Sequence, residues 1–441
     1  MRFIIKASHE RLTAHSGLGL IGLLLEKTDL RPKLNQLMIP RLKYPLLSHS
    51  DIVYAMIGLL AQGKSDFEHI EAFREDDFFQ YALQLKSVPS RARLRQRLDG
   101  LAQIRKWRNI LLDEMVRLPR KAGLEPSAIK LNSGTYYVPI DVDVSPFDNT
   151  DTHKEGVSRT YKGCDGYAPL LAYIGREGYG LYAELREGRT HVQKEVDQKL
   201  REMIPRAKSM TEKPLLLRMD AGNDALNNLA VCQEEGVHFI IKRNLRRESP
   251  EAWLAIAQDQ GKATAIREGC TRYTGKIRVT DPGLPQPVYQ VFDVRETTIA
   301  KDGQILFIPE ITVDVYWTDL DEDVADIIDL YHDHATCEQF HSELKTDLDL
   351  ERLPSGKFAT NDLVLCLGLF TYTLLRIISQ ESLRVNDSPL RKKVQRRRIR
   401  TVIQTLITLA AKMVTHARRQ YLYIGSRAWL TPFKRLYQAF A

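Results

Sequence analysis

The sequence predicts an α/β protein of several domains, with a mixed β-sheet core and a β-rich insertion, flanked by all-helical N- and C-terminal regions. Two observations predict this organisation, and a third argues against a small fold held by disulfides or zinc. The 441 residues exceed what a single hydrophobic core usually supports. The apolar residues change their spacing from three and four near the N-terminus to two from about residue 134. Five cysteines stand singly, without the paired spacing of a disulfide framework or a zinc site.

Residues 1–125 are predicted to be helical throughout. Segments 49–73 and 90–118 carry apolar residues three and four positions apart, as amphipathic helices do. Ser90 suits the N-cap position, and four arginines crowd the turns behind it: Arg91, Arg93, Arg95 and Arg97. Because cations oppose the dipole at a helix start, we expect these arginines to meet an external anion. A helical DNA-binding domain is one interpretation, and a simple helical packing domain is the other.

Residues 134–244 are predicted to form the first part of the core. Segment 136–145 alternates, with Asp141 and Asp143 on the face opposite to its branched apolar side chains. A continuous apolar run then ends in Asp220, as in a strand that is buried on both faces. Strands are expected over 168–175, 180–188, 213–222 and 236–243, with a helix over 191–204.

The rest of the chain divides into three predicted parts. Residues 245–320 carry short strands and form the β-rich insertion, whereas 321–383 are helical and complete the core. Residues 384–441 form a basic helical region with fourteen Lys or Arg and one acid, in a chain of net charge +8. Such a charge indicates a polyanionic partner, most commonly nucleic acid. A solvated helix face is the alternative interpretation of the basic region.

Carboxylates on the predicted core strands point to metal chemistry. Asp143 and Asp220 stand on neighbouring strands of the expected sheet, where they would repel each other without a cation. A third ligand is expected from a helix packed across the sheet. On a helical wheel of residues 331–345, Tyr331, His334, Glu338 and Lys345 lie within about 60° of one another. Glu343 falls on the opposite side, which favours Glu338 as that ligand.

This stripe of side chains suits phosphodiester chemistry. A carboxylate such as Glu338 completes a two-metal site that activates water and stabilises the leaving oxygen. Tyr331, His334 and Lys345 are predicted to hold adjacent phosphates of DNA along the same groove. A surface helix with mixed charge is the alternative.

The stripe resembles the Y-x2-R-x3-E-x6-K signature of the DDE transposases of bacterial insertion sequences, with His334 in the place of the arginine. The flanking sequence is similar to that of the transposases of the thirteen-eighty group of these elements, over roughly residues 85–380. Its phrases recur here in order: DVDVS, GYAPL (166–170), LREG (185–188), DAG (220–222) and KTDLDLERLPSGKFATN (345–361). Because several motifs occur in order, the resemblance is more specific than the signature alone.

The resemblance implies an RNase H-like core in which Asp143, Asp220 and Glu338 bind two Mg²⁺ ions, or Mn²⁺. Asp141 lies on the same strand face as Asp143 and stays an alternative for the first aspartate. The family implies cut-and-paste transposition: binding of terminal inverted repeats, strand cleavage, and transfer to target DNA by a homodimer. His334 departs from the family, because imidazole is shorter than guanidinium and titrates near neutrality.

Further DNA contacts are predicted outside the stripe. Trp317 in the insertion is the candidate for stacking on a flipped base, with an ordinary core position as the alternative. Phosphate contacts are expected from Lys242, Arg243, Arg396, Arg397 and Arg398. Two rival functions stay open, namely a metal-dependent nuclease without strand transfer and a catalytically decayed DNA-binding protein. The longest apolar run, 363–375, is too short to span a membrane, so a cytoplasmic, nucleoid-associated protein is expected.

Overall fold

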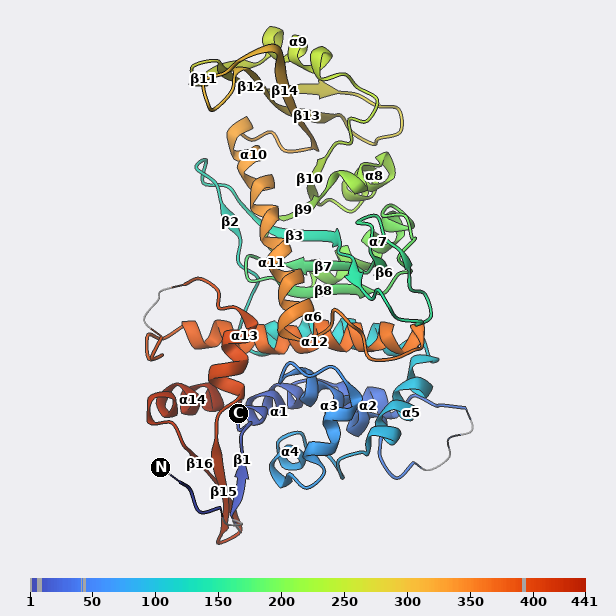
Figure 1. Cartoon of the computed structure of the whole chain (residues 1–441), viewed down its shortest axis with the longest axis vertical. Coiled ribbons are helices and arrows are strands. Elements are labelled where there is room, and N and C mark those ends of the chain that lie inside the picture. Colours follow the sequence, from blue (N-terminus) through green and yellow to red (C-terminus); the bar gives the residue numbers. More distant parts are fainter. Residues whose placement is uncertain (1, 6–9, 41, 43–44, 391–393) are drawn as a thin grey trace.

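The computed structural model describes residues 2–5, 10–40, 42, 45–390 and 394–441. The elements stack along the long axis of the molecule (Figure 1). Helices from the N-terminal part and the C-terminal elements form one end, and a long helix crosses above them. The main sheet follows, and the strands of the insertion form the other end.

The N-terminal part is mostly helical, as predicted. Ser48 and Ser90 cap two of its helices by accepting the backbone N–H of Asp51 and Arg93. The predicted helical stretch 90–118 is divided into two helices at residues 103–105. The helices are α1 (Leu18–Glu26), α2 (Leu30–Asn35), α3 (His49–Leu60), α4 (Asp77–Ala82), α5 (Arg91–Ala102) and α6 (Lys106–Lys121).

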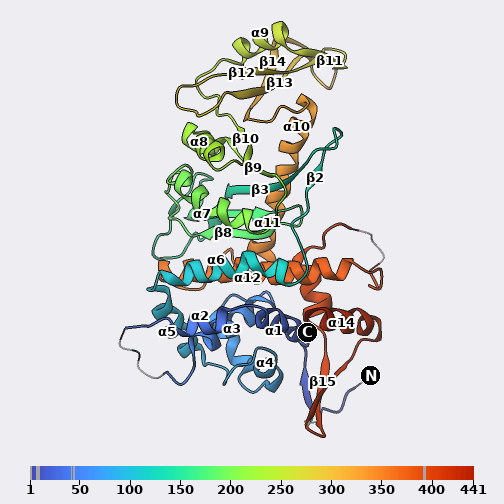
Figure 2. The ribbon, with the colours of Figure 1, turned by 180° about the vertical axis from the view of Figure 1, so that it is seen from behind.

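The prediction that both ends of the chain are all helical is wrong. Strand β1 (Arg11–Thr13) pairs antiparallel with β15 (Ala411–His416), which pairs with β16 (Arg419–Ile424) in a three-stranded sheet. Ala417 and Arg418 connect β15 and β16 with φ of 50° and 62°, the positive values of a tight hairpin turn. Helices α13 (Ile399–Val402) and α14 (Arg427–Phe440) flank the hairpin, and the sheet joins the two ends of the chain (Figure 2).

The main sheet contains the predicted core strands in one half, from β10 to the edge strand β8. Its order is β11-β12-β13-β14-β10-β9-β3-β7-β8, with β2 (Ile129–Lys130) paired to β3. Strand β9 runs parallel to both β3 and β10, whereas the other pairs are antiparallel. The core strands are β3 (Tyr136–Val144), β7 (Leu170–Ile174), β8 (Tyr179–Glu184), β9 (Leu215–Met219) and β10 (His238–Lys242).

The insertion continues the core sheet. Strand β14 pairs antiparallel with the core strand β10, so the two share one hydrogen-bonded ladder. The insertion also contains a helix that the sequence analysis missed, α9 (Pro250–Gln260), which starts at a Ser-Pro cap and packs Trp253 against Phe292. Its strands are β11 (Lys262–Arg267), β12 (Cys270–Val279), β13 (Val288–Ile299) and β14 (Ile305–Thr318).

Helices cover both faces of the sheet. Alternate residues of β9 point to opposite faces, so Leu216 packs in the cluster that contains Ile327 of α10 (Val324–His332). Leu215 and Leu217 belong to the other cluster, with apolar residues of α7 (Val196–Lys208) and α8 (Leu226–Glu234). Figure 1 shows α10 and α11 (Thr336–Ser342) crossing their face of the sheet.

A long helix, α12 (Phe358–Leu383), lies at the centre of the molecule. It contacts β8 on one side and α1, α3 and α5 on the other, and α6 runs beside it (Figures 1 and 2). It is the one described helix that is long and apolar enough to cross a membrane, yet 94% of its apolar window is buried inside the fold. The apolar residues of α12 are therefore explained by packing between the sheet and the N-terminal helices.

Candidate functional site at the carboxyl ends of the central strands

Two of the predicted carboxylates meet where the parallel strands β3 and β9 end. The strand register pairs Asp141 with Arg218 and Val142 with Met219, and one further step places Asp220 beside Asp143. Residues an even number of positions apart in a strand share a face, and so do residues paired across two neighbouring strands. Asp220 therefore shares the face of Leu216, which packs against α10, and Asp143 beside it lies on the same face, which α10 and α11 cross. Burial and the negative charge of Asp143 both raise the pKa of Asp220. Two carboxylates that repel each other in this way fit a divalent cation.

Each of these two carboxylates is held in place by the chain. Asp220 accepts the backbone N–H of Gly222 at 3.1 Å and the side-chain amide of Asn223 at 2.8 Å. Asp143 accepts the backbone N–H of Val144 at 2.7 Å, and its Oδ2 atom lies 3.2 Å from Nε2 of His341. Burial acts to raise the pKa of Asp143, but His341, His334 and the Val144 N–H together lower that pKa.

Asp141, the alternative first aspartate, is engaged by two other side chains. Its carboxylate accepts two hydrogen bonds from Arg218, at 2.8 and 2.9 Å, and lies 2.8 Å from Nδ1 of His334. Arg218 also donates to the carbonyl oxygen of Leu330 at 2.7 Å, which ties β9 to α10. Although burial acts to raise the pKa of Asp141, the charge of Arg218 and the His334 contact lower it. Asp141 therefore belongs to a buried ion pair that joins two strands and a helix.

The predicted stripe lies on a helix that is not regular. A 3-10 turn (Asp333–Ala335) separates α10 from α11, and a π turn (Glu343–Asp347) follows. His334 is buried, and its contact with Asp141 leaves only Nε2 for a phosphate. Lys345 lies in the π turn, where its Nζ atom donates to the carbonyl oxygen of Pro146 at 2.5 Å. The ring of Tyr331 lies 5.8 Å from the ring of His334, and burial and the charge of Asp220 raise the pKa of its phenol.

Glu338, the predicted third ligand, is exposed. Across the described part of the chain it has no hydrogen bond or ion pair with another residue. Within the same ranges, no three His, Cys, Asp or Glu side chains come close enough together to hold a metal ion. Asp143 and Asp220 thus fit a divalent cation as a pair, and Glu338 is a free carboxylate on the helix that crosses them.

Glu343 lies on the opposite side of this helix, in a buried ionic cluster. Its carboxylate accepts from Arg376 at 2.6 Å, from Arg396 at 2.7 Å, from the Tyr372 hydroxyl at 3.0 Å and from the Ile399 backbone N–H at 3.2 Å. We name these side chains, Glu343, Arg376, Arg396 and Tyr372, the Glu343 cluster. It attaches the π turn to α12 and to the C-terminal segment.

The three arginines predicted to contact DNA all bind the protein itself. Arg396 belongs to the Glu343 cluster, and Arg398 forms an ion pair with Asp347 at 2.9 Å. Arg397 is buried and donates to the hydroxyl of Ser382 at 3.3 Å. The lysines and arginine at 391–393 lie outside the described residues. Arg396 and Arg398, in the second half of the basic run, therefore attach the C-terminal segment to the π turn of the site helix.

The predicted DNA contacts at the end of β10 and in the insertion are also occupied. Lys242 forms an ion pair with Asp314 at 2.5 Å, and Arg243 pairs with Glu248 at 2.5 Å while its guanidinium lies 4.8 Å from the ring centre of Trp317. Trp317 is only 8% exposed, and its indole N–H donates to Asp224 at 3.0 Å. Asp224 follows the turn that begins at Asp220, so Trp317 supports that turn from the insertion.

His341 and Arg218 are site residues that the sequence analysis missed. His341 is buried, and its Nδ1 atom lies 3.3 Å from the Tyr173 hydroxyl while Nε2 faces Asp143. With the proton on Nε2, the ring donates to Asp143 and accepts from Tyr173. The available signal was spacing, because His341 stands seven residues after His334 and so shares its helix face. For Arg218, the signal was a charge inside an apolar strand, which requires a buried partner.

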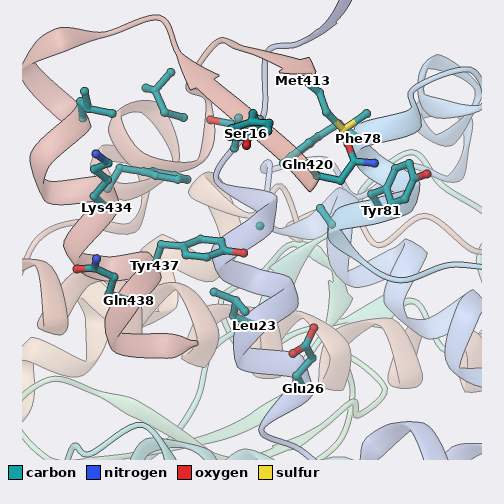
Figure 3. A pocket seen from close by; sticks show the side chains of 17 residues that line it. Ser16, Leu23, Glu26, Phe78, Tyr81, Met413, Gln420, Lys434, Tyr437 and Gln438 are labelled. Carbon is teal, nitrogen blue, oxygen red and sulfur yellow. The ribbon is translucent and has the colours of Figure 1, made fainter. Parts of the chain in front are cut away.

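A pocket of about 490 Å³ lies away from these carboxylates, between the two ends of the chain (Figure 3). Leu23 of α1, Tyr81 of α4, Gln420 of β16 and Tyr437 of α14 contribute to its wall. None of the predicted site residues lines it. The pocket is a feature of the joined chain ends and is separate from the candidate site.

Comparison with known proteins gives a family for the sequence. The model of the family described as "Transposase DDE domain group 1" matches residues 3–440. A solved structure, the piggyBac transposase synaptic complex with hairpin DNA, is similar with a TM-score of 0.38 and 12% sequence identity. That match covers 91% of this chain and 83% of the other, and at this TM-score it carries no argument. No curated protein matches the chain.

Proposed function

Because the chain belongs to the DDE transposase family, domain group 1, we propose that it cleaves and transfers DNA strands with Asp143, Asp220 and Glu338 as its metal-binding carboxylates. The meeting of Asp143 and Asp220 at the ends of the parallel strands β3 and β9 carries this proposal. The order β8-β7-β3-β9-β10, antiparallel and then parallel, supports an RNase H-like core. The ordered motifs support the thirteen-eighty group of insertion sequences.

The chain's own residues prepare the site for cations. Two Mg²⁺ or Mn²⁺ ions bound there would supply activation of water and stabilisation of the leaving oxygen. His341 and the Val144 N–H hold Asp143, whereas Asn223 holds Asp220, so both carboxylates are oriented in advance. Asp141 is assigned to the ion pair with Arg218, which leaves Asp143 as the first aspartate. Glu338 has no partner among the residues that the structure describes, and it joins the pair when DNA binds.

DNA contacts are proposed on two surfaces. Beside the carboxylates, Tyr331 and Lys345 hold phosphates of the strand that is cut. On α5, Arg93 and Arg95 are exposed toward a DNA end, whereas Arg97 is buried against the carbonyl oxygen of Leu47 at 2.8 Å. The DNA bound there is the terminal inverted repeat of an element, and a homodimer pairs two such ends for insertion into target DNA.

Cleavage of a duplex that carries the flanking end of the element tests this proposal. Asp143→Asn, Asp220→Asn and Glu338→Gln should each abolish Mg²⁺-dependent cleavage while DNA binding changes less than about twofold, because the amide keeps the shape but loses the charge. Asp333→Asn, at an exposed acid on the same helical segment, is the matched control and should cleave normally.

The same assay separates the rival functions. Cleavage without joining to a second duplex would indicate a nuclease, and binding without cleavage by the wild-type protein would indicate a decayed transposase. Full cleavage by both the Asp143→Asn and the Asp220→Asn variant would overturn the proposed site.

A further inference from the structure

A small hairpin beside the candidate site has no role in the function proposed so far. Strands β4 (Phe147–Asp148), β5 (Ser158–Arg159) and β6 (Asp165–Tyr167) form a separate three-stranded sheet directly after β3. Between β5 and β6, the Thr160 N–H donates to the carbonyl oxygen of Cys164 at 2.9 Å, and Gly163 has a φ of +82°. Because glycine adopts such a φ without strain, the turn is tight and presents Tyr161 and Lys162 at its tip.

Tyr161 is an exposed aromatic residue that is fixed at the edge of the site. It is 58% exposed, yet its hydroxyl donates to the carbonyl oxygen of Val144 at 2.9 Å. Val144 directly follows Asp143, so this bond attaches the phenol to the end of β3. Burial of the hydroxyl end and the charges of Asp143 and Asp220 raise the pKa of Tyr161, in agreement with its place beside both carboxylates.

Two lysines, Lys162 and Lys345, lie in the same part of the chain as this ring. Nζ of Lys162 lies 6.0 Å from the centre of the Tyr161 ring. Nζ of Lys345 binds the carbonyl oxygen of Pro146 and lies 5.3 Å from the ring centre of Phe147, in the segment that leads from β3 to the hairpin. Burial lowers the pKa of Lys345, and the positive charge of Lys162 acts in the same direction. Each ammonium group therefore lies near an aromatic ring of this part of the chain, Lys162 near Tyr161 and Lys345 near Phe147.

We propose that Tyr161, Lys162 and Lys345 form a nucleotide-binding lip, in which the Tyr161 ring stacks on the base next to the cleaved phosphate and the lysines contact the flanking phosphates. This inference rests on the proposed function. Stacking on an aromatic ring tolerates any base, because every base has a π face. Trp317, the candidate that the sequence offered for such a role, is buried and bonded to Asp224, whereas Tyr161 is exposed and held by its hydroxyl.

A DNA duplex with a fluorescent adenine analogue next to the cleaved phosphate tests the lip, once the wild-type cleavage position is mapped. Stacking on Tyr161 should quench the analogue when wild-type protein binds. Tyr161→Ala should abolish the quench and weaken binding about 5- to 150-fold, the loss expected for one stacked base. Tyr161→Phe keeps the ring and should restore most of the quench. Tyr136→Ala, at a 46% exposed tyrosine on the other end of β3, should behave as wild type.

The outcomes distinguish the lip from the function on which it rests. Wild-type cleavage with an unchanged quench in Tyr161→Ala would overturn the lip and leave the transposase proposal intact. A wild-type protein that neither binds nor cleaves the duplex would overturn both. For the lysines, Lys162→Gln should reduce the slope of log K against log salt by about one phosphate contact, and an unchanged slope would remove Lys162 from the lip.

Discussion

Replacing Glu343 by glutamine should destabilise the whole protein. Glu343 is 1% exposed, and Arg376 beside it is fully buried with a second nitrogen, Nε, that has no partner in the described ranges. Glutamine keeps the shape of the side chain but removes the charge that faces Arg376 and Arg396. Breaking a buried ion pair from one side typically costs about 3–5 kcal/mol, because the remaining charge stays buried without compensation.

The expected shift in melting temperature follows from the size of the chain. Unfolding entropy is about 2.1 cal/mol/K per residue, which gives about 0.9 kcal/mol/K for 441 residues. A loss of 3–5 kcal/mol therefore lowers Tm by about 3–5 °C. Scanning calorimetry of the DNA-free protein measures this shift.

Glu71→Gln is the matched control for this measurement. Glu71 is exposed and pairs with Arg74 on the surface, at 3.5 Å. A surface pair contributes about 0–1 kcal/mol, so this variant should melt within about 1 °C of wild type. A Glu343→Gln protein that melts together with the control would refute the reasoning, and the Glu343 cluster would then contribute nothing measurable.

Three further predictions concern residues around the site. His341→Phe should weaken Mn²⁺ binding to the protein about 10- to 100-fold by electron paramagnetic resonance, because Asp143 loses its orienting partner, and unchanged affinity would contradict this. Arg398→Gln should lower Tm through the loss of the Asp347 ion pair while leaving the salt slope of DNA binding unchanged; a flatter slope would mean that Arg398 contacts phosphate after all. Trp317→Phe should cost about 1 kcal/mol through the lost indole hydrogen bond and keep DNA binding, whereas a large loss of binding would restore a stacking role.

The central strands could be predicted because their patterns are local. Alternation over 136–145 and the apolar run before Asp220 identify β3 and β9, and the carboxyl ends of parallel strands meet at one edge of a sheet. This is why Asp143 and Asp220 were found together from sequence. The partner of Asp141 could not be predicted, because no local pattern gives the register of β9 against β3 that pairs Asp141 with Arg218.

The role of the C-terminal arginines could not be predicted for the same reason. A run of cations looks equally basic whether its partner is DNA or a pair of acids elsewhere in the chain. Glu343 and Asp347 stand about fifty residues earlier, in a π turn that the wheel of 100° per residue does not describe. The sequence therefore shows that this segment is basic. Its acidic partners, Glu343 and Asp347, can be identified only from the three-dimensional packing.

The two histidines explain how a free Glu338 can still be aimed. His334 contacts Asp141, and His341 contacts Asp143. One face of the helix is therefore attached to one face of β3 at two points. A single contact would let the helix rotate about it, whereas two contacts separated by two helical turns fix both its rotation and its position along the strand. Glu338 lies between them in the sequence, in the same helix α11 as His341 and within about 60° of it around the helix axis. The buried histidines thus set the direction of Glu338, and its carboxylate, which has no partner in the described ranges, is available to the cation and the DNA.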